Sequence, residues 1–174
     1  MIAIIAEKPS VGMDIARVVG ADTRNDGYCS GNGYMVTWAL GHLVSLATPD
    51  TYGYTKTAAE DLPMLPDPFR LVSRQMRTDR GMVTDIAASK QLKVIESVFN
   101  RCDSIIVATD AGREGELIFR WIYDFLGCTK PFRRLWISSL TDEAIRKGLE
   151  ELKDGSEYDS LYAAADSRAK ADWL

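Results

Sequence analysis

A short run of β-branched residues that ends in an acidic loop constrains the fold of this chain most. Residues 104–109 read Ser-Ile-Ile-Val-Ala-Thr, are flanked by charge, and favour a buried strand of a parallel sheet over a helix. Asp110 then stands at the carboxyl end of that strand. Two glycines loosen the turn that follows, and residues 116–126 predict a helix that Gly127 ends. The pattern is typical of an α/β fold.

Three carboxylates crowd into seven residues after this strand. They are Asp110, Glu114 and Glu116, with Arg113 between them. Ligands of open α/β sheets bind at the carboxyl ends of strands, and clustered carboxylate oxygens suit Mg²⁺ best. The same acids could instead only stabilise the first turn of a helix through its macrodipole, by a few tenths to about 1 kcal/mol each. The local pattern leaves both interpretations open.

A second acidic strand end lies at the amino terminus. Residues 1–6 predict another short buried strand, and Glu7 and Lys8 follow it directly. Ser10 is then expected to cap a helix. Alone, Glu7 would be interpreted as a solvated turn residue. If the two strands are neighbours in a parallel sheet, however, Glu7 converges with the other acids, and Lys8 beside it can meet a phosphate.

Five separated segments resemble one known family. Residues 4–10 (Ile-Ile-Ala-Glu-Lys-Pro-Ser) and 110–116 (Asp-Ala-Gly-Arg-Glu-Gly-Glu) resemble the Toprim domain of type IA DNA topoisomerases, and the topoisomerase III branch in particular. Residues 38–43, 136–145 and 165–174 agree, in the family's order and across the whole chain. Other Toprim enzymes, such as primases and nucleases, are the first alternative. A phosphate-binding module without chemistry of its own is the second.

The resemblance implies a Rossmann-like α/β fold with a mainly parallel sheet flanked by helices. It places the Toprim domain at residues 1–154 and the start of a following helical domain, cut short, at residues 155–174. It also implies a catalytic tyrosine, which this chain is expected to lack. None of its tyrosines has a sequence context that resembles the family's nucleophile motif: Tyr28, Tyr34, Tyr52, Tyr54, Tyr123, Tyr158 and Tyr162.

Carried over by position, the resemblance gives each site residue a role. Glu7 would protonate the leaving 3′ oxygen of a cleaved DNA strand and later deprotonate it, and Lys8 would hold the scissile phosphate. Asp110 and Glu114 would bind Mg²⁺, with Glu7 as a further candidate ligand. Arg113 would contact DNA phosphate, or would reduce repulsion within the acid cluster.

Three neighbouring residues are less determined. His42, the only histidine, is a candidate DNA contact near the metal, and a structural role is an equal alternative. Glu116 is expected to lie outside the ligand set, or to cap a helix. Gly112 stands where the family usually has a second aspartate, which implies one Mg²⁺ rather than two.

Composition limits how this chain can bind nucleic acid. The net charge is −4 and the pI is near 5.1, so weak and salt-sensitive binding of single-stranded DNA is expected. The arginines at 70, 74, 77, 80, 133 and 134 are interpreted as solvated charges, most of them on a mobile insert, and a local basic face is the alternative. Three widely spaced cysteines argue against zinc and disulfides. No membrane span or signal peptide is evident, which predicts a cytoplasmic protein. The resemblance implies that it is bacterial and associated with DNA.

The sequence also predicts the remaining elements and partners. The resemblance implies a monomer, with single-stranded DNA or DNA with single-stranded regions as substrate and a helicase as a possible partner of the full-length protein. Thr141 is expected to cap a helix, and Ile86 to face inward from a helix over residues 85–99. The other expected elements are a hairpin of 28–30 with 34–40, a surface loop at 47–69, strands at 69–73 and 135–137, a linker at 153–156 and a last helix from 157 to 174.

Overall fold

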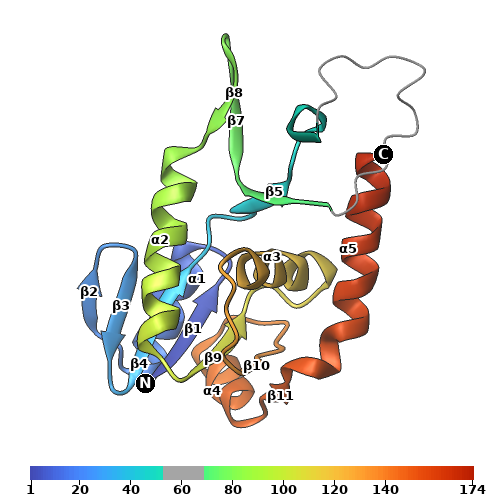
Figure 1. The fold of residues 1–174 in the computed structure, drawn as a ribbon. Coiled ribbons are helices and arrows are strands. Elements are labelled where there is room, and N and C mark those ends of the chain that lie inside the picture. Colours follow the sequence, from blue (N-terminus) through green and yellow to red (C-terminus); the bar gives the residue numbers. More distant parts are fainter. Residues whose placement is uncertain (53–68) are drawn as a thin grey trace.

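The computed structural model describes residues 1–52 and 69–174 and shows an α/β architecture built on a seven-stranded sheet (Figure 1). The strand order is β11-β10-β9-β1-β4-β3-β2. These strands are β1 (Ile2–Ala6), β2 (Thr23–Asn25), β3 (Tyr28–Gly31), β4 (Tyr34–Trp38), β9 (Ser104–Ala108), β10 (Phe132–Arg134) and β11 (Lys153–Asp154). The helices are α1 (Pro9–Val19), α2 (Ile86–Arg101), α3 (Arg113–Phe125), α4 (Asp142–Glu150) and α5 (Asp159–Trp173), with 3₁₀ turns at Pro49–Tyr52 and Gly155–Tyr158.

The two predicted acidic strands are neighbours at the centre of the sheet. Strand β1 pairs in parallel with β9, with Ala6 opposite Ala108, and in parallel with β4 on its other side. Strand β10 extends the parallel part beyond β9, while β2, β3 and β11 are antiparallel. The carboxyl ends of β1 and β9 therefore open on the same edge of the sheet, and the predicted fold class is confirmed.

Alternation along β1 divides the core into two layers. Ala3 and Ile5 are fully buried against the cluster that includes α2 and α3. Ile4 and Ala6 are fully buried on the opposite face, against α1 and α4. A strand covered on both faces needs apolar residues at every position, which explains the continuous Ile-Ala-Ile-Ile-Ala sequence.

The expected cap of the first helix is wrong. Lys8 occupies the N-cap position of α1 without a capping hydrogen bond from its side chain, and Pro9 begins the helix. Proline suits the first helical position because its ring presets φ and the missing N–H has no partner there. Ser10 therefore lies within the first turn. Gly20 ends the helix at φ 83°.

The elements that flank the acidic loop also differ from prediction. Helix α3 begins at Arg113, three residues earlier than expected, which brings Glu114 into its first turn. A strand was expected at residues 135–137. The strand in this region, β10, lies three residues earlier, at 132–134, because those residues pair with β9. The expected linker is partly sheet, since Lys153 and Asp154 pair with β10.

Helix α2 differs from the expected helix in the direction of one side chain, that of Ile86. Asp85 caps it by accepting hydrogen bonds from the Ala87 and Ala88 N–H groups, but Ile86 is 81% exposed rather than inward. The buried stripe runs through Ala88, Leu92, Ile95 and Phe99. Ile86 precedes Ala88 by two positions, and at about 100° per residue it points to the opposite side of the helix.

Three small β elements complete the described part of the chain. Strand β5 (Val44–Leu46) pairs with β6 (Leu71–Ser73), the latter close to the predicted strand. The polar arginine segment forms an unpredicted hairpin of β7 (Gln75–Thr78) and β8 (Gly81–Thr84), which stands away from the sheet in Figure 1. The predicted hairpin of β3 with β4 is confirmed. Most of the predicted 47–69 loop, residues 53–68, lies outside the described residues.

Helix α5 packs on the same core rather than standing apart from it. It contacts α3, and its Ala165 is buried in the larger core cluster. Near its end, the Trp173 Nε1 atom donates a hydrogen bond to the Ala47 carbonyl at 2.8 Å. The domain boundary expected at residue 154 stays a prediction. None of the helices in the described ranges has the length and apolar character needed to cross a membrane.

Candidate active site

The sheet brings together the two acidic strand ends that the sequence singles out. Glu7 follows β1 and Asp110 lies two residues after β9. The Asp110 backbone N–H donates a hydrogen bond to the Glu7 carboxylate at 3.1 Å, across 103 residues of sequence. The expected convergence of Glu7 with the acidic loop is therefore present in the structure.

Close packing of glycine fixes the loop that carries Asp110. A β-carbon at Gly115 would collide with the Asp110 carbonyl oxygen, so only glycine allows α3 to start this near to the strand end. The Thr109 hydroxyl adds a hydrogen bond to the Gly115 carbonyl at 2.8 Å. The turn from β9 into α3 is thus held from both sides, which leaves Asp110 and Glu114 on one short arc.

A cavity of about 380 Å³ opens beside this arc. Glu7, Asp110 and Glu114 all line it, and so does Gly112, whose missing β-carbon would meet nothing within 4 Å. Two arginines also line the cavity: the predicted Arg113, and Arg168 from α5, which sequence reasoning had not singled out. Within residues 1–52 and 69–174, no three carboxylate, histidine or cysteine side chains stand close enough together to form a metal-binding group.

Glu114 has a different partner in this structure. The His42 Nε2 atom lies 2.9 Å from Glu114 Oε2, and the two side chains are 40% and 76% exposed. The His42 ring centroid is 6.1 Å from that of Trp121, and the His42 carbonyl accepts a hydrogen bond from Arg74 at 3.0 Å. His42 therefore lies at the predicted site, bonded to a candidate metal ligand. Its contact with DNA stays a prediction.

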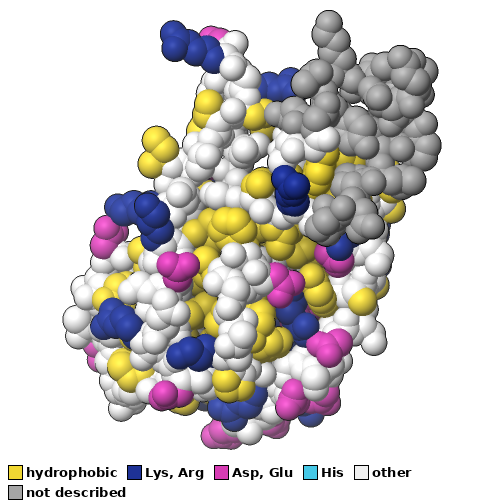
Figure 2. Space-filling view, viewed as in Figure 1, with side chains coloured by type: hydrophobic (Ala, Val, Ile, Leu, Met, Phe, Trp, Pro, Cys, Tyr) yellow, Lys and Arg dark blue, Asp and Glu magenta, His cyan; other side chains and the backbone are white. Residues whose placement is uncertain are grey.

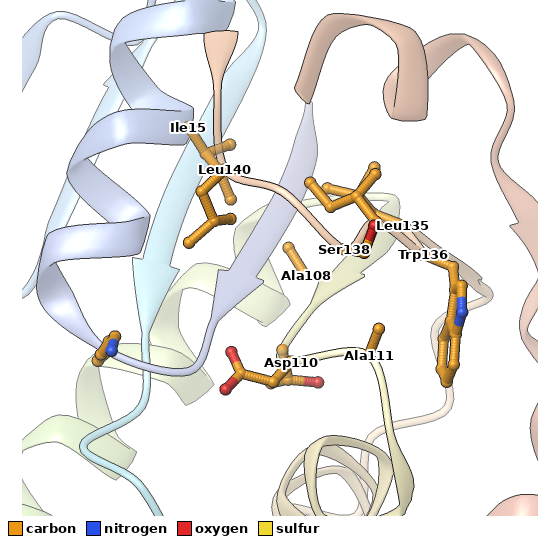
Figure 3. Close-up of a pocket in the computed structure, with 11 residues that line it drawn as sticks. Ile15, Ala108, Asp110, Ala111, Leu135, Trp136, Ser138 and Leu140 are labelled. Atoms are coloured by element: carbon orange, nitrogen blue, oxygen red, sulfur yellow. The ribbon is translucent and has the colours of Figure 1, made fainter. Parts of the chain in front are cut away.

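Lys8 faces a second cavity, of about 510 Å³, on the other side of the acidic loop. Figure 3 shows Asp110 and Ala111 along one side of this cavity, with Ile15 and Leu140 across from them. Asp110 and Ala111 line both cavities, so the loop forms the partition between them. Of the candidate catalytic pair, Glu7 therefore lines the smaller cavity and Lys8 lines the larger one, while Asp110 lines both.

A buried arginine that the sequence analysis misinterpreted supports the partition from behind. Arg134 is 1% exposed, contrary to the expected solvated charge. Its guanidinium donates hydrogen bonds to the Asp110 carbonyl at 2.7 Å, the Thr109 hydroxyl at 3.0 Å and the Val107 carbonyl at 3.2 Å. The neighbouring Arg133 of the same strand is exposed, so no local pattern distinguished the two arginines.

Glu116 neutralises this buried arginine. Its Oε1 atom lies 2.9 Å from Arg134 Nε in an ion pair outside hydrogen-bond geometry, and its Oε2 atom accepts a hydrogen bond from Arg120 at 3.3 Å. Glu116 is 1% exposed and lines neither cavity. Burial raises the pKa of Glu116 and lowers that of Arg134, and in each case the partner's charge opposes the shift. Glu116 therefore holds Arg134, which in turn holds the Asp110 loop, and it does not face either cavity.

The surroundings of the Glu7 carboxyl raise its pKa. Burial raises its pKa, the hydrogen bond from the Asp110 backbone opposes that rise, and the Asp110 charge adds to it. A carboxyl with a raised pKa keeps its proton closer to neutral pH, which general acid catalysis requires.

Basic side chains form no continuous band on the face drawn in Figure 2, where Lys and Arg alternate with Asp and Glu. Arg74 is not a free surface charge, since it donates to Asp85 at 3.0 Å and to the Leu40 carbonyl at 2.6 Å. Arg77 and Arg80 of the hairpin are exposed, as expected. The three cysteines are free thiols, and two of them, Cys29 and Cys102, are buried.

Comparison with known proteins agrees with the geometry. The chain is 50% identical to "DNA topoisomerase 3" of Shouchella clausii (strain KSM-K16) over 98% of its length and 22% of that protein. It is 46% identical to "DNA topoisomerase 3" of Bacillus subtilis (strain 168) over 98% of its length and 23% of that protein. The chain therefore spans less than a quarter of the length of these relatives, and the expected resemblance is confirmed.

A solved structure shares the fold. Full-length topoisomerase I from Thermotoga maritima matches with a TM-score of 0.52 and 18% identity, over 87% of this chain and 21% of that one. The family model for the Toprim domain matches residues 2–140, which include both acidic strand ends and the loop between β9 and α3. The chain belongs to the Toprim domain family.

Proposed function

We propose that this chain supplies the Toprim half of the active site of a type IA DNA topoisomerase of the topoisomerase III branch, which cleaves, passes and reseals single DNA strands. One observation carries the proposal. Glu7, Lys8 and Asp110 meet at the carboxyl edge of β1 and β9, around two adjoining cavities. Ligands of α/β sheets bind at this edge, and the names of the relatives point to DNA as the substrate.

The chemistry is the transfer of a phosphodiester between two oxygens. A tyrosine outside this chain loses its hydroxyl proton to water and attacks phosphorus, so that a phosphotyrosine ester forms as the bond to the 3′ oxygen breaks. Lys8 holds the scissile phosphate, and Glu7 gives its proton to the leaving 3′ oxygen. Resealing runs the steps in reverse, with the Glu7 carboxylate taking that proton back. Positioning and charge neutralisation carry most of such a reaction.

The tyrosine has to come from elsewhere. No tyrosine is among the residues that line the two cavities, and Tyr54 lies outside the described residues. The chain alone should therefore bind DNA without cleaving it.

The cavity offers carboxylates for one Mg²⁺, although in the described residues they do not stand close enough together to form a three-ligand group. Asp110 and Glu114 would hold it, with Glu7 as a further ligand, since all three line one cavity and supply the hard oxygen donors that Mg²⁺ prefers. Mg²⁺ keeps several waters, so two or three protein ligands suffice. The ion would neutralise charge on the phosphate. Gly112 contributes no carboxylate, which favours one ion over two.

A hybrid enzyme tests the proposal. The first 174 residues replace the matching segment of the Bacillus subtilis relative, and relaxation of negatively supercoiled DNA with Mg²⁺ is measured. We expect relaxation and a covalent protein–DNA adduct, both lost in Glu7→Gln and Lys8→Ala. Glu151→Gln, an exposed carboxylate that lies outside both cavities, should leave activity unchanged. Full activity of Lys8→Ala and Glu7→Gln would refute the assigned roles.

The isolated chain gives a complementary result. With Mg²⁺ and single-stranded DNA, it should form no covalent adduct and should bind weakly, with affinity that falls steeply as salt rises. A covalent adduct would show that the chain contains its own nucleophile. The monomeric state, the helicase partner and the cytoplasmic location stay predictions.

A further inference from the structure

The cavity beside Lys8 is larger than a phosphate or a metal ion requires. Its volume of about 510 Å³ is within the range of pockets that take small organic ligands. Most of its lining is apolar, from Ile15, Ala108, Leu135 and Leu140, with hydroxyl groups at Thr109 and Ser138. Lys8 and Asp110 are the charged side chains in its lining. Such a lining suits a flat, neutral ring system linked to an anionic group.

An exposed aromatic ring forms one wall. Trp136 is 41% exposed, and Figure 3 shows its indole at one side of the cavity, with Ala111 between it and Asp110. Exposing an indole is unfavourable because its large apolar surface stays in water. A ligand that packs against the ring would remove this apolar surface from water and so offset the cost. The other described tryptophans include Trp38 and Trp121, which are buried in the core.

The indole is also held in place before any ligand arrives. It stacks on Tyr158 with ring centroids 4.9 Å apart and an interplanar angle of 22°. The Arg134 guanidinium lies 5.2 Å from its centroid. Tyr158 and Trp136 line a neighbouring cavity together, so Tyr158 supports the ring from outside the Lys8 cavity. A fixed ring loses little conformational entropy when a second ring stacks on it.

We infer that the Lys8 cavity is a subsite for one nucleobase of the single-stranded DNA, with the base stacked on the Trp136 indole and its phosphate next to Lys8. The inference rests on the proposed function and adds a base contact to it. Proteins that bind single strands without sequence preference stack bases on aromatic side chains beside basic groups that follow the backbone, and each stacked base contributes about 1–3 kcal/mol. A chain with a net charge of −4 would gain much of its affinity this way.

The test compares two oligomers on the 174-residue chain at low salt. One is fluorescein-labelled decathymidylate, and the other is a deoxyribose-phosphate oligomer of equal length without bases. Trp136→Ala should weaken binding of decathymidylate roughly 5- to 150-fold and leave the baseless oligomer unaffected. Trp136→Phe, which keeps an aromatic face, should stay near wild type. Trp173→Phe, on α5 away from the cavity, is the matched control.

Tryptophan emission gives an independent readout that does not depend on the stability of the alanine variant. Decathymidylate should quench the emission of the wild-type chain, and the quenching should be lost in Trp136→Phe and kept in Trp173→Phe. If Trp136→Ala binds decathymidylate as tightly as wild type while Lys8→Ala weakens both oligomers, the base subsite is wrong and the proposed function stands. If Lys8→Ala changes neither oligomer, the phosphate contact of the proposed function fails, and the subsite fails with it.

Discussion

Gly115 and Asp110 approach so closely that a β-carbon on the glycine would overlap the carbonyl oxygen of the aspartate. The contact joins the first turn of α3 to the end of β9, and it fixes where the Asp110 carboxylate can lie. The position of a candidate metal ligand is therefore set by a residue without a side chain.

Gly115→Ala should lower the free energy of unfolding by about 1–3 kcal/mol, because backbone atoms cannot rotate away from an added methyl group. Gly148→Ala in α4 is the control, since its β-carbon would meet Leu135 Cδ1 at 2.5 Å and Ile137 Cγ2 at 2.6 Å, atoms of side chains that can move. Urea unfolding measures both. A loss at Gly115 no larger than at Gly148 would show that the Asp110 loop is pliable.

Gly112→Asp should bind Mg²⁺ more tightly than wild type, by roughly a factor of ten, because it adds a carboxylate to a cavity that already has three. The extra negative charge should also lower stability when no metal is present. Gly112→Asn is the matched control, with the same shape and the same φ of 158° but no charge. Calorimetric titration with Mg²⁺ compares them, and equal affinities would argue against a metal at this cavity.

Arg134→Met should cost about 3–5 kcal/mol of stability, because it leaves the buried Glu116 carboxylate without its nearest cation. The double variant Arg134→Met, Glu116→Leu should recover part of that loss by removing the uncompensated charge. Chemical unfolding of the wild type, both single variants and the double variant gives the coupling free energy between the two residues. Strictly additive losses would mean that the pair is not coupled.

Asp85 gives a pH-dependent prediction. Its hydrogen bond from the Ala88 N–H lowers its pKa from the usual 3.8, and Arg74 lowers it further. The folded-state pKa is depressed, so the stabilisation is present above pH 3.8 and is lost as pH falls through the lowered value. Asp85→Asn should therefore melt below wild type at pH 7, and the difference should shrink below about pH 4. Asp79→Asn, on the exposed turn of the hairpin, should show no such trend.

Local sequence predicted the centre of the fold because the decisive signals there are local. The β-branched runs at β1 and β9 determine buried strands, and parallel pairing then requires their carboxyl ends to coincide. The meeting of Glu7 with Asp110 follows from that rule without knowledge of any other contact. Thr141, whose hydroxyl accepts from the Ala144 N–H at 3.2 Å, was equally predictable as a cap.

The errors lie where distant residues decide the outcome. Arg134 is buried because the Asp110 carbonyl and Glu116 satisfy it, and neither partner is near it in sequence. The position of β10 depends on its register with β9. Ile86 is a separate, local error, since it lies on the side of α2 opposite the buried stripe that includes Ala88 and Leu92. The bond of His42 to Glu114 spans 72 residues, and no pattern within either segment indicates it.

The place of β1 between β4 and β9 sets the order of events during synthesis. Strand β4 is made soon after β1, but β9 follows only after the β7–β8 hairpin and α2 have been translated. At roughly 5–20 residues per second, the open edge of β1 waits for several seconds with its N–H and C=O groups unpaired. Such an edge can pair with another nascent chain. The length of chain between β4 and β9 therefore determines how long misassembly on the ribosome competes with completion of the active site.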